Sequence, residues 1–383
     1  MPDQNLLNIV SSVINRCGEV QLIQPINWEY IIHKARLHGL SHLVYKALEY
    51  ISEIDKPSTE LINELKVDYY RNIQKQIRIL ADAENILNLF ESNKIYVIPM
   101  KGYNTKDRYP EEYMRSMGDL DLLTRSKQYK MIHSLLKAKG YDGFIENRKH
   151  DQYWGKSKIC IEIHRSMVAE NSMYSDYYKD IWQRTLKAEG KKYIFKMNAE
   201  DEYIFNIVHL IEHLRTSGIT IRFILDVYIY ITYVELDREY LDNEFRKLKL
   251  SKFVSFLENL ANEWFSVNTT ELSRNEGIDA LGKYVLDYGS VKQRKMAANM
   301  HTLKGKKHYL LESIFPNYKN MISIYPWLNN KKYLLPLAWV VRGYRSIRGK
   351  RGHIKAVINR YKNANRSVQN ELKDFYKTIG IDI

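Results

Sequence analysis

The sequence has few cysteines and no long apolar run, and each shortage excludes a class of protein. Its 383 residues include two cysteines, Cys17 and Cys160, which are too few for a disulfide framework and lack the spacing of a zinc site. The longest apolar run, residues 333–341, is interrupted by Pro336 and is far shorter than the roughly 20 residues of a membrane-spanning helix. The first ten residues do not combine a basic region with an apolar segment, so we expect no signal peptide. Together these features predict a protein of the reducing cytoplasm.

Acidic residues are absent between Glu312 and Glu371. This interval contains twelve Lys or Arg residues, so it contributes +12 of the net charge of +14, and the rest of the chain contributes +2. A basic segment beside a nearly neutral body predicts an anionic partner for residues 313–370, either nucleic acid or an anionic membrane surface. A membrane partner would make the chain peripheral at that surface. The alternative is a pair of helices that dock on the core and expose their basic ends to water.

Two acids stand out in residues 118–123, because they alternate with leucines. In a strand, Asp119 and Asp121 would share one face, and Leu120 and Leu122 would share the other. Two carboxylates that point the same way repel each other. A fold tolerates this arrangement mainly where a cation or a donor-rich ligand lies between them.

A second alternating segment, residues 159–164, would place Glu162 on one face of a buried strand and isoleucines on the other. A third carboxylate from a separate strand completes a candidate magnesium site. Three acids that hold one or two Mg²⁺ ions are typical of phosphoryl or nucleotidyl transfer. We therefore predict that Asp119, Asp121 and Glu162 bind metal and carry the catalysis, and that Glu162 also accepts the proton of the nucleophile.

The residues before the first acid pair are suited to phosphate. Lys101 and Gly102 follow a short apolar run, residues 95–100, that predicts a buried strand. Glycine allows a ligand to approach the backbone closely, and a helix that begins here would direct free N–H groups toward a phosphate. Lys101 and Arg115 are candidates to neutralise the phosphate charge.

Other polar residues carry weaker signals. Asp107 and Glu146 are alternative acids, but neither lies in an apolar run. His164 shares the face of Glu162, where it could polarise an acceptor, contact phosphate or be a structural histidine. Arg222 and Asp226 are four residues apart, so on a helix they are expected to form a salt bridge.

Residues 209–213 read H-x-x-E-H, which predicts a different chemistry. On a helix His209 and His213 share one face, as an inverted zinc peptidase motif requires. The third zinc ligand would have to be an acid farther along, such as Glu258 or Glu263. The alternatives are two core or interface histidines, or two histidines that face a nucleotide cleft.

The chain resembles the DNA polymerase beta-like nucleotidyltransferase superfamily, and within it an uncharacterised bacterial nucleotidyltransferase family. The motifs that carry the resemblance are Lys101-Gly102, Tyr109-Pro110 and the run RSMGDLDLL from Arg115 to Leu123. Similarity extends outward over residues 26–45, 209–226 and 325–339. One departure is Tyr103, which follows Gly102 where the wider superfamily has serine or a second glycine.

The resemblance implies transfer of a nucleoside monophosphate from an NTP to an acceptor, with Mg²⁺ or alternatively Mn²⁺ and with release of pyrophosphate. It implies that Lys101, Gly102, Arg115 and Gly118 bind the nucleotide, but it does not imply an acceptor. The alternative is a non-catalytic nucleotide- or anion-binding adaptor that has the same fold.

Helical periodicity dominates on both sides of these motifs. Asn27, Ser41 and Asn198 are expected to cap helices, whereas helix and strand alternate over about a hundred residues between the helical parts. We predict an α+β fold in which a small mixed-sheet nucleotidyltransferase core is flanked by helical domains. The predicted parts are an N-terminal helical region at 1–85, the core at 86–190, a helical domain at 195–310 and a basic C-terminal helical segment at 311–383.

Overall fold

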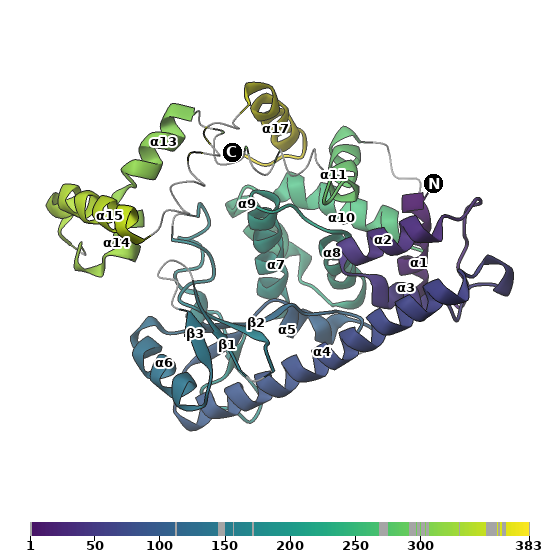
Figure 1. Cartoon of the computed structure of the whole chain (residues 1–383), viewed down its shortest axis with the longest axis horizontal. Coiled ribbons are helices and arrows are strands. Elements are labelled where there is room, and N and C mark those ends of the chain that lie inside the picture. Colours follow the sequence, from purple (N-terminus) through teal and green to yellow (C-terminus); the bar gives the residue numbers. More distant parts are fainter. Residues whose placement is uncertain are drawn as a thin grey trace.

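The computed structural model has an α+β architecture, with one mixed five-stranded sheet and helices around it, which confirms the predicted fold class (Figure 1). The described residues are 2–111, 113–144, 150–155, 157–170, 172–267, 275–290, 296, 299, 303, 306–328, 330–349, 358, 361 and 365–382. Glu146 and five of the twelve basic residues of the acid-free segment lie outside them. None of the described helices is long and apolar enough to cross a bilayer.

The chain begins with helices α1 (Pro2–Asn15), α2 (Trp28–His38) and α3 (Ser41–Ala47). The Asn27 side chain accepts a hydrogen bond from the Tyr30 backbone N–H at 3.0 Å, so the predicted cap of α2 is confirmed. The prediction for Ser41 is wrong. Ser41 is the first residue of α3, and the cap position is held by Leu40, which offers no side-chain acceptor.

Helix α4 (Thr59–Ser92) is a single helix of 34 residues, roughly 50 Å long at 1.5 Å per residue. Its N-terminal half packs through Leu61 and Leu65 on the large helical core, and its C-terminal half packs through Ile86 and Phe90 on the sheet. Figure 1 shows it running along one side of the molecule from α3 to α6. One helix therefore connects the two main hydrophobic clusters.

The sheet has the strand order β1-β2-β5-β4-β3, and only β2 and β5 are parallel neighbours. Its strands are β1 (Val97–Pro99), β2 (Asp119–Thr124), β3 (Asp142–Phe144), β4 (His150–Trp154) and β5 (Cys160–His164). Between them lie the one-turn helix α5 (Gly102–Thr105) and helix α6 (Tyr129–Ala138), and a two-stranded sheet of β6 (Leu186–Lys187) and β7 (Phe195–Lys196) follows. Both acid-bearing segments are thus central strands of one sheet, as their alternation predicts.

A helical body covers the end of the sheet where α5 lies (Figure 1). It consists of α7 (Ala199–Leu214), α8 (Ile221–Tyr233), α9 (Arg238–Lys247), α10 (Ser251–Phe265) and α11 (Glu276–Leu286). Asn198 accepts from the Asp201 N–H at 2.7 Å, so this predicted cap is also confirmed. The body shares one hydrophobic core with α1, α2 and α3.

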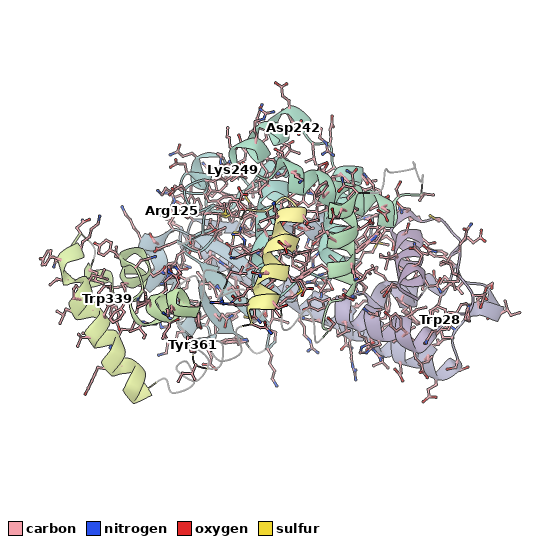
Figure 2. The ribbon with its side chains drawn as sticks, turned by 90° about the horizontal axis from the view of Figure 1, so that it is seen from above. Trp28, Arg125, Asp242, Lys249, Trp339 and Tyr361 are labelled. Carbon is pink, nitrogen blue, oxygen red and sulfur yellow. The ribbon has the colours of Figure 1, made fainter. Side chains whose placement is uncertain are left out.

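The basic C-terminal part is divided between two places. Helices α13 (Lys306–Ile314), α14 (Tyr318–Ile324) and α15 (Leu335–Gly349) lie together, and a small separate cluster around Met321 and Ala338 holds α14 and α15. Helix α17 (Arg366–Thr378) instead packs on the main core through Leu372 and Tyr376. Seen from above in Figure 2, Trp339 on α15 and Trp28 on α2 mark opposite ends of the molecule. The domain boundaries stated above remain predictions.

Candidate active site

The parallel pairing of β2 with β5 brings the three predicted acids together. Asp121 lies opposite Glu162 in register, and Asp119 is two residues earlier on the same face of β2. One carboxylate oxygen from each of the three lies within 4.8 Å of the others. The structure therefore assembles Asp119, Asp121 and Glu162 into a single cluster.

The opposite face of these strands holds the cluster in place. Leu120, Leu122, Ile161 and Ile163 are fully buried against α4 and α6. Slipping either strand by one residue would put leucines or isoleucines at the cluster and carboxylates in the apolar core, so the register is strongly specified.

Cations and donors compensate the buried negative charge. The Lys101 ammonium donates to Asp121 Oδ1, and His164 Nε2 lies 2.7 Å from the same oxygen and 3.3 Å from Glu162 Oε2. Gln152 of β4 donates to Glu162 Oε1 at 2.8 Å. Asp121 Oδ1 and both oxygens of Glu162 are therefore paired with donors, as low-dielectric surroundings require.

The three carboxyl groups differ in acidity. Burial acts to raise the pKa of Asp121, but Lys101 and His164 outweigh it and hold that pKa far below its usual value. Burial likewise opposes the hydrogen bonds from His164 and Gln152, which nevertheless lower the pKa of Glu162. Burial and the charge of Asp121 raise the pKa of Asp119 to about 6. Asp119 is thus the acid for which a further cation would be most favourable.

The chemistry of this cluster fits a hard divalent cation. Mg²⁺ and Mn²⁺ prefer carboxylate oxygens, and the cluster offers three of them, with a lysine ammonium already in contact. His150, Glu162 and His164 form a second group whose ligand atoms are equally close, so Glu162 is common to both. Within the described part of the chain these are the two groups of three that could hold a metal ion.

Asp119 and Asp121 open onto a cavity of about 320 Å³ between the sheet and the helical body, and Glu162 lies beside them. On the sheet side it is lined by Lys101, Gly102, Met117, Gly118, Asp119 and Asp121, and Arg115 joins the helical side through its contact with Asp226 of α8. On the helical side α7 and α8 contribute Asn206, His209, His213, Arg222, Phe223 and Asp226, among others. The cavity is large enough for a small ligand, and all four predicted nucleotide-binding residues lie in its wall.

The close approach of the Met117 side chain to the backbone of Gly102 explains the glycine at this position. A Cβ atom there would come 3.0 Å from Met117 Cγ, so a larger residue would push against the segment that leads into Asp119. The element that starts at Gly102 is a single turn of helix, which continues as a 3₁₀ turn to Arg108. It is therefore much shorter than the helix that the phosphate hypothesis envisaged. The alternative acid Asp107 lies in this turn and pairs with Lys106, away from the acid cluster.

Arg115 lies in the wall of the cavity but is fixed by another residue. Its Nε donates to Asp226 Oδ1 at 2.6 Å and its Nη2 to Asp226 Oδ2 at 2.8 Å, and the Tyr109 hydroxyl donates to Oδ1 at 2.6 Å. Asp226 thus attaches the segment before the acids to α8. The expected Arg222–Asp226 salt bridge is wrong, because Arg115 takes both oxygens of Asp226 and Arg222 donates to the Ser116 carbonyl at 3.1 Å.

His209 and His213 face the cavity with their rings 4.4 Å apart. His213 Nδ1 lies 3.0 Å from the Ser217 hydroxyl. Neither histidine belongs to a metal-binding group of three among the described residues, and Glu258 instead accepts from Tyr203 and Arg238. These contacts give the zinc hydrolase hypothesis no support, and they favour the alternative in which both histidines face a ligand cleft.

Some residues that shape the site escape sequence reasoning. Gln76 on α4 forms two hydrogen bonds with the backbone of Met117, accepting from its N–H at 2.9 Å and donating to its carbonyl at 3.2 Å. His150 and Gln152 belong to β4, a strand that the sequence did not predict. Its alternation of His150, Gln152 and Trp154 with the buried Asp151 and Tyr153 is the signal that could have indicated it.

Comparison with known proteins points to one family. A model described as uncharacterised nucleotidyltransferase matches residues 24–266, which include every residue of the acid cluster and its cavity except Tyr288. No curated protein matches the chain. No solved structure matches it either. Since the match covers more than half of the sequence, the chain belongs to the uncharacterised nucleotidyltransferase family.

Proposed function

We propose that this protein is a Mg²⁺-dependent nucleotidyltransferase of the polymerase beta-like superfamily, with Mn²⁺ as the alternative metal. It would move a nucleoside monophosphate from an NTP to an acceptor and release pyrophosphate. The observation that carries this proposal is the convergence of Asp119, Asp121 and Glu162, of which Asp119 and Asp121 line a cavity of about 320 Å³. Membership of the family supports the reaction class.

The proposed reaction is an in-line substitution at the α-phosphorus. The acceptor's nucleophilic oxygen forms a bond to that phosphorus, and the bond from phosphorus to the oxygen bridging to the β-phosphate breaks. Pyrophosphate leaves with the bonding electron pair, and the acceptor's proton passes to Glu162. Bound divalent ions would stabilise the charge of the phosphates and lower the pKa of the nucleophile.

The residues around the acids have distinct proposed roles. Asp119 and Asp121 hold the metal, and Glu162 completes its ligands. Lys101 and Arg115 neutralise phosphate charge, while Gly102 and Gly118 keep the backbone accessible to the nucleotide. Arg115 suits this role because Asp226 already fixes its orientation.

One contact favours a second function. The Lys101 ammonium and the His164 imidazole both contact Asp121 Oδ1, so they compensate part of the buried negative charge without a metal. A chain that has kept this arrangement but lost turnover would be a nucleotide- or anion-binding adaptor. Both functions use the same cavity, so only turnover separates them.

Titration calorimetry with each NTP in the presence of Mg²⁺, beside a transfer assay with α-³²P-labelled NTPs, tests the two functions. Transfer of label with release of pyrophosphate supports the enzyme. Binding without transfer to any of a panel of protein, sugar and RNA acceptors supports the adaptor. The double variant Asp119→Asn/Asp121→Asn should lose Mg²⁺-dependent binding, whereas Asp107→Asn, an exposed acid outside the cluster, should keep it.

We further propose an anionic partner for residues 313–370 and a cytoplasmic location for the chain. The excess of twelve positive charges in the acid-free segment supports the first, and the scarcity of cysteine supports the second. Either nucleic acid or an anionic membrane surface would supply the complementary charge.

A further inference from the structure

The helical wall of the cavity has more positive than negative charge. Arg115 and Arg222 both reach this wall and both donate to the carbonyl of Ser116. Asp226 is the carboxylate between them, and Arg115 and Tyr109 take its hydrogen bonds. Within the described part of the chain, no carboxylate lies within ion-pair distance, 4.0 Å, of Arg222.

The positive charge of the Arg222 guanidinium is therefore poorly compensated by negative charge nearby. The positive charge of Arg115, followed by burial, lowers the pKa of Arg222 to about 10. The hydrogen bond to Ser116 is the one that Arg222 makes within the described residues, although a guanidinium has five N–H donors. An anion in the cavity would supply both the missing charge and the missing acceptors.

Arg222 lies in the helical wall, whereas Asp119 and Asp121 lie in the sheet wall of the same cavity. Guanidinium groups bind phosphate in a bidentate geometry that matches their planar fork. We propose that Arg222, with Arg115 beside it, forms a phosphate-binding subsite on the α8 side of the cavity. The proposal builds on the proposed function, because the phosphate would belong either to the NTP or to a phosphorylated acceptor.

The test uses the full-length chain with inorganic pyrophosphate in EDTA, with inorganic phosphate in EDTA, and with each NTP and Mg²⁺, all by calorimetry. Arg222→Gln should weaken pyrophosphate binding by about 10-fold to 100-fold, and Arg222→Lys by less, because lysine keeps the charge but not the fork. Arg125→Gln is the matched control. That arginine stacks on Tyr96 and Trp182 outside the cavity, and its loss should leave binding unchanged.

The pattern of losses identifies the source of the phosphate. If NTP affinity falls with pyrophosphate affinity, the subsite holds the triphosphate; if only phosphate affinity falls, it holds an acceptor phosphate. Absence of pyrophosphate and phosphate binding to the wild type, or equal binding by wild type and a folded Arg222→Gln, overturns the subsite. Pyrophosphate binding that depends on Arg222 in a protein without transfer activity would keep the subsite and reject the enzyme.

A second inference concerns α15, which has apolar residues on two faces. Ala338, Trp339 and Val341 pack in the small cluster with α14. Leu337, Val340 and Tyr344 follow the spacing i, i+3 and i+7, which places them on one side of α15, and they are 54, 69 and 57% exposed. Tyr333, in the 3₁₀ turn just before α15, is 76% exposed. An exposed stripe of this kind indicates an interaction surface.

The charges beside the stripe are of one sign. Lys331, Lys332 and Arg345 are exposed next to it, and the segment from 313 to 370 contains no acid. Bases stack on aromatic rings and gain little from aliphatic side chains, whereas the boundary between lipid headgroups and acyl chains accepts both leucine and valine. We infer that this face of α15 lies on an anionic bilayer surface, with its basic residues at the lipid headgroups.

Co-sedimentation with vesicles of phosphatidylcholine alone and with 30% phosphatidylglycerol tests this surface. The wild type should bind the anionic vesicles at least tenfold more tightly, and Leu337→Glu/Val340→Glu should abolish the difference. Ile54→Glu/Val67→Glu, which changes two exposed apolar residues elsewhere, should bind like the wild type. Absence of binding to anionic vesicles overturns the inference. If single-stranded RNA binds instead, the basic segment has a nucleic-acid partner.

Discussion

The two walls of the cavity are built in opposite ways. The sheet wall carries Asp119 and Asp121, with Glu162 of the adjacent strand beside them, and Lys101, which contacts Asp121, comes from the turn next to β1. The helical wall carries two arginines around one aspartate, and Asp226 pairs with a residue 111 positions earlier in the chain. The register of β2 with β5 alone determines the acidic sheet wall. The basic helical wall, in contrast, forms only when segments that are distant in the sequence meet. Their opposite charges suit a ligand that brings both cations and phosphates.

The largest effect is expected from the sheet wall. Asp119→Asn should reduce nucleotidyl transfer by about 10³-fold, because one metal ligand is lost where charge develops in the transition state. Its metal-free stability should not fall, since the substitution removes repulsion between Asp119 and Asp121. Single-turnover rates and thermal melts in EDTA measure the two effects. If Asp119→Asn keeps the wild-type rate of nucleotidyl transfer, the chemistry does not depend on the acids of the sheet wall.

Lys101→Met tests whether the sheet wall contains its own counter-ion. Without the ammonium, Asp121 remains buried beside two other carboxylates, so the metal-free protein should lose about 3 kcal/mol of stability. Mg²⁺ should restore more of the melting temperature in this variant than in the wild type. Lys106→Met, which removes the partner of the exposed Asp107, is the control and should show neither change. Equal sensitivity of both variants to Mg²⁺ would argue against a cation site at the acids.

The helical wall should make stability depend on pH through His42. Burial lowers the pKa of His42 to about 4, aided by Arg222 and Arg115 and opposed by the hydrogen bond to the Met114 carbonyl. In the unfolded chain the pKa is about 6.5, so between pH 6.5 and 4 the unfolded state binds a proton that the folded state excludes. The free energy of unfolding should therefore fall by about 2 kcal/mol as the pH decreases through this window.

Urea unfolding at pH 7.5 and 5.0 measures this loss of stability. His42→Gln should reduce the difference between the two pH values, while the exposed His33→Gln should preserve it. An unchanged difference in His42→Gln would mean that His42 does not carry the pH dependence.

The smallest effect is expected at Gln76, which holds the backbone that leads into the acids. Gln76→Ala leaves the buried N–H and carbonyl of Met117 without their partner, so we expect a loss of about 1 kcal/mol. Transfer should slow by about tenfold with little change in NTP affinity, because the side chain positions the acids without touching the ligand. Gln74→Ala, on the exposed side of the same helix, is the control. Equal losses in kcat and in affinity would instead indicate a general loss of structure.

The sheet wall could be predicted from the sequence, whereas the helical wall could not. Asp119, Asp121 and Glu162 could be found because alternation with leucine and isoleucine is a local pattern that specifies both strand and face. The caps at Asn27 and Asn198 are also predictable, because an N-cap is a local pattern. Helix α3 instead begins at Ser41, and Leu40 occupies the cap position without a side-chain hydrogen bond.

The helical wall could not be predicted, because its pairs have no sequence signature. Arg222 and Asp226 have the spacing of a helix salt bridge, yet a bidentate contact from Arg115 is available in the fold and Asp226 takes it. Strand β4 was missed because its polar residues His150 and Gln152 face the acid cluster, which obscures the apolar signal of a central strand. Long-range electrostatic pairing, rather than propensity, decides these positions.

The continuity of α4 has a mechanical consequence. A helix that is anchored at one end in the bundle and at the other beneath the sheet cannot bend sharply without losing backbone hydrogen bonds. The residues that lead into the acids are also held from two sides, because Asp226 accepts hydrogen bonds from Tyr109 and Arg115, and Gln76 pairs with the Met117 backbone. We therefore expect the distance across the cavity to be set by α4 and by these two attachments, which leaves little freedom for the cavity to widen.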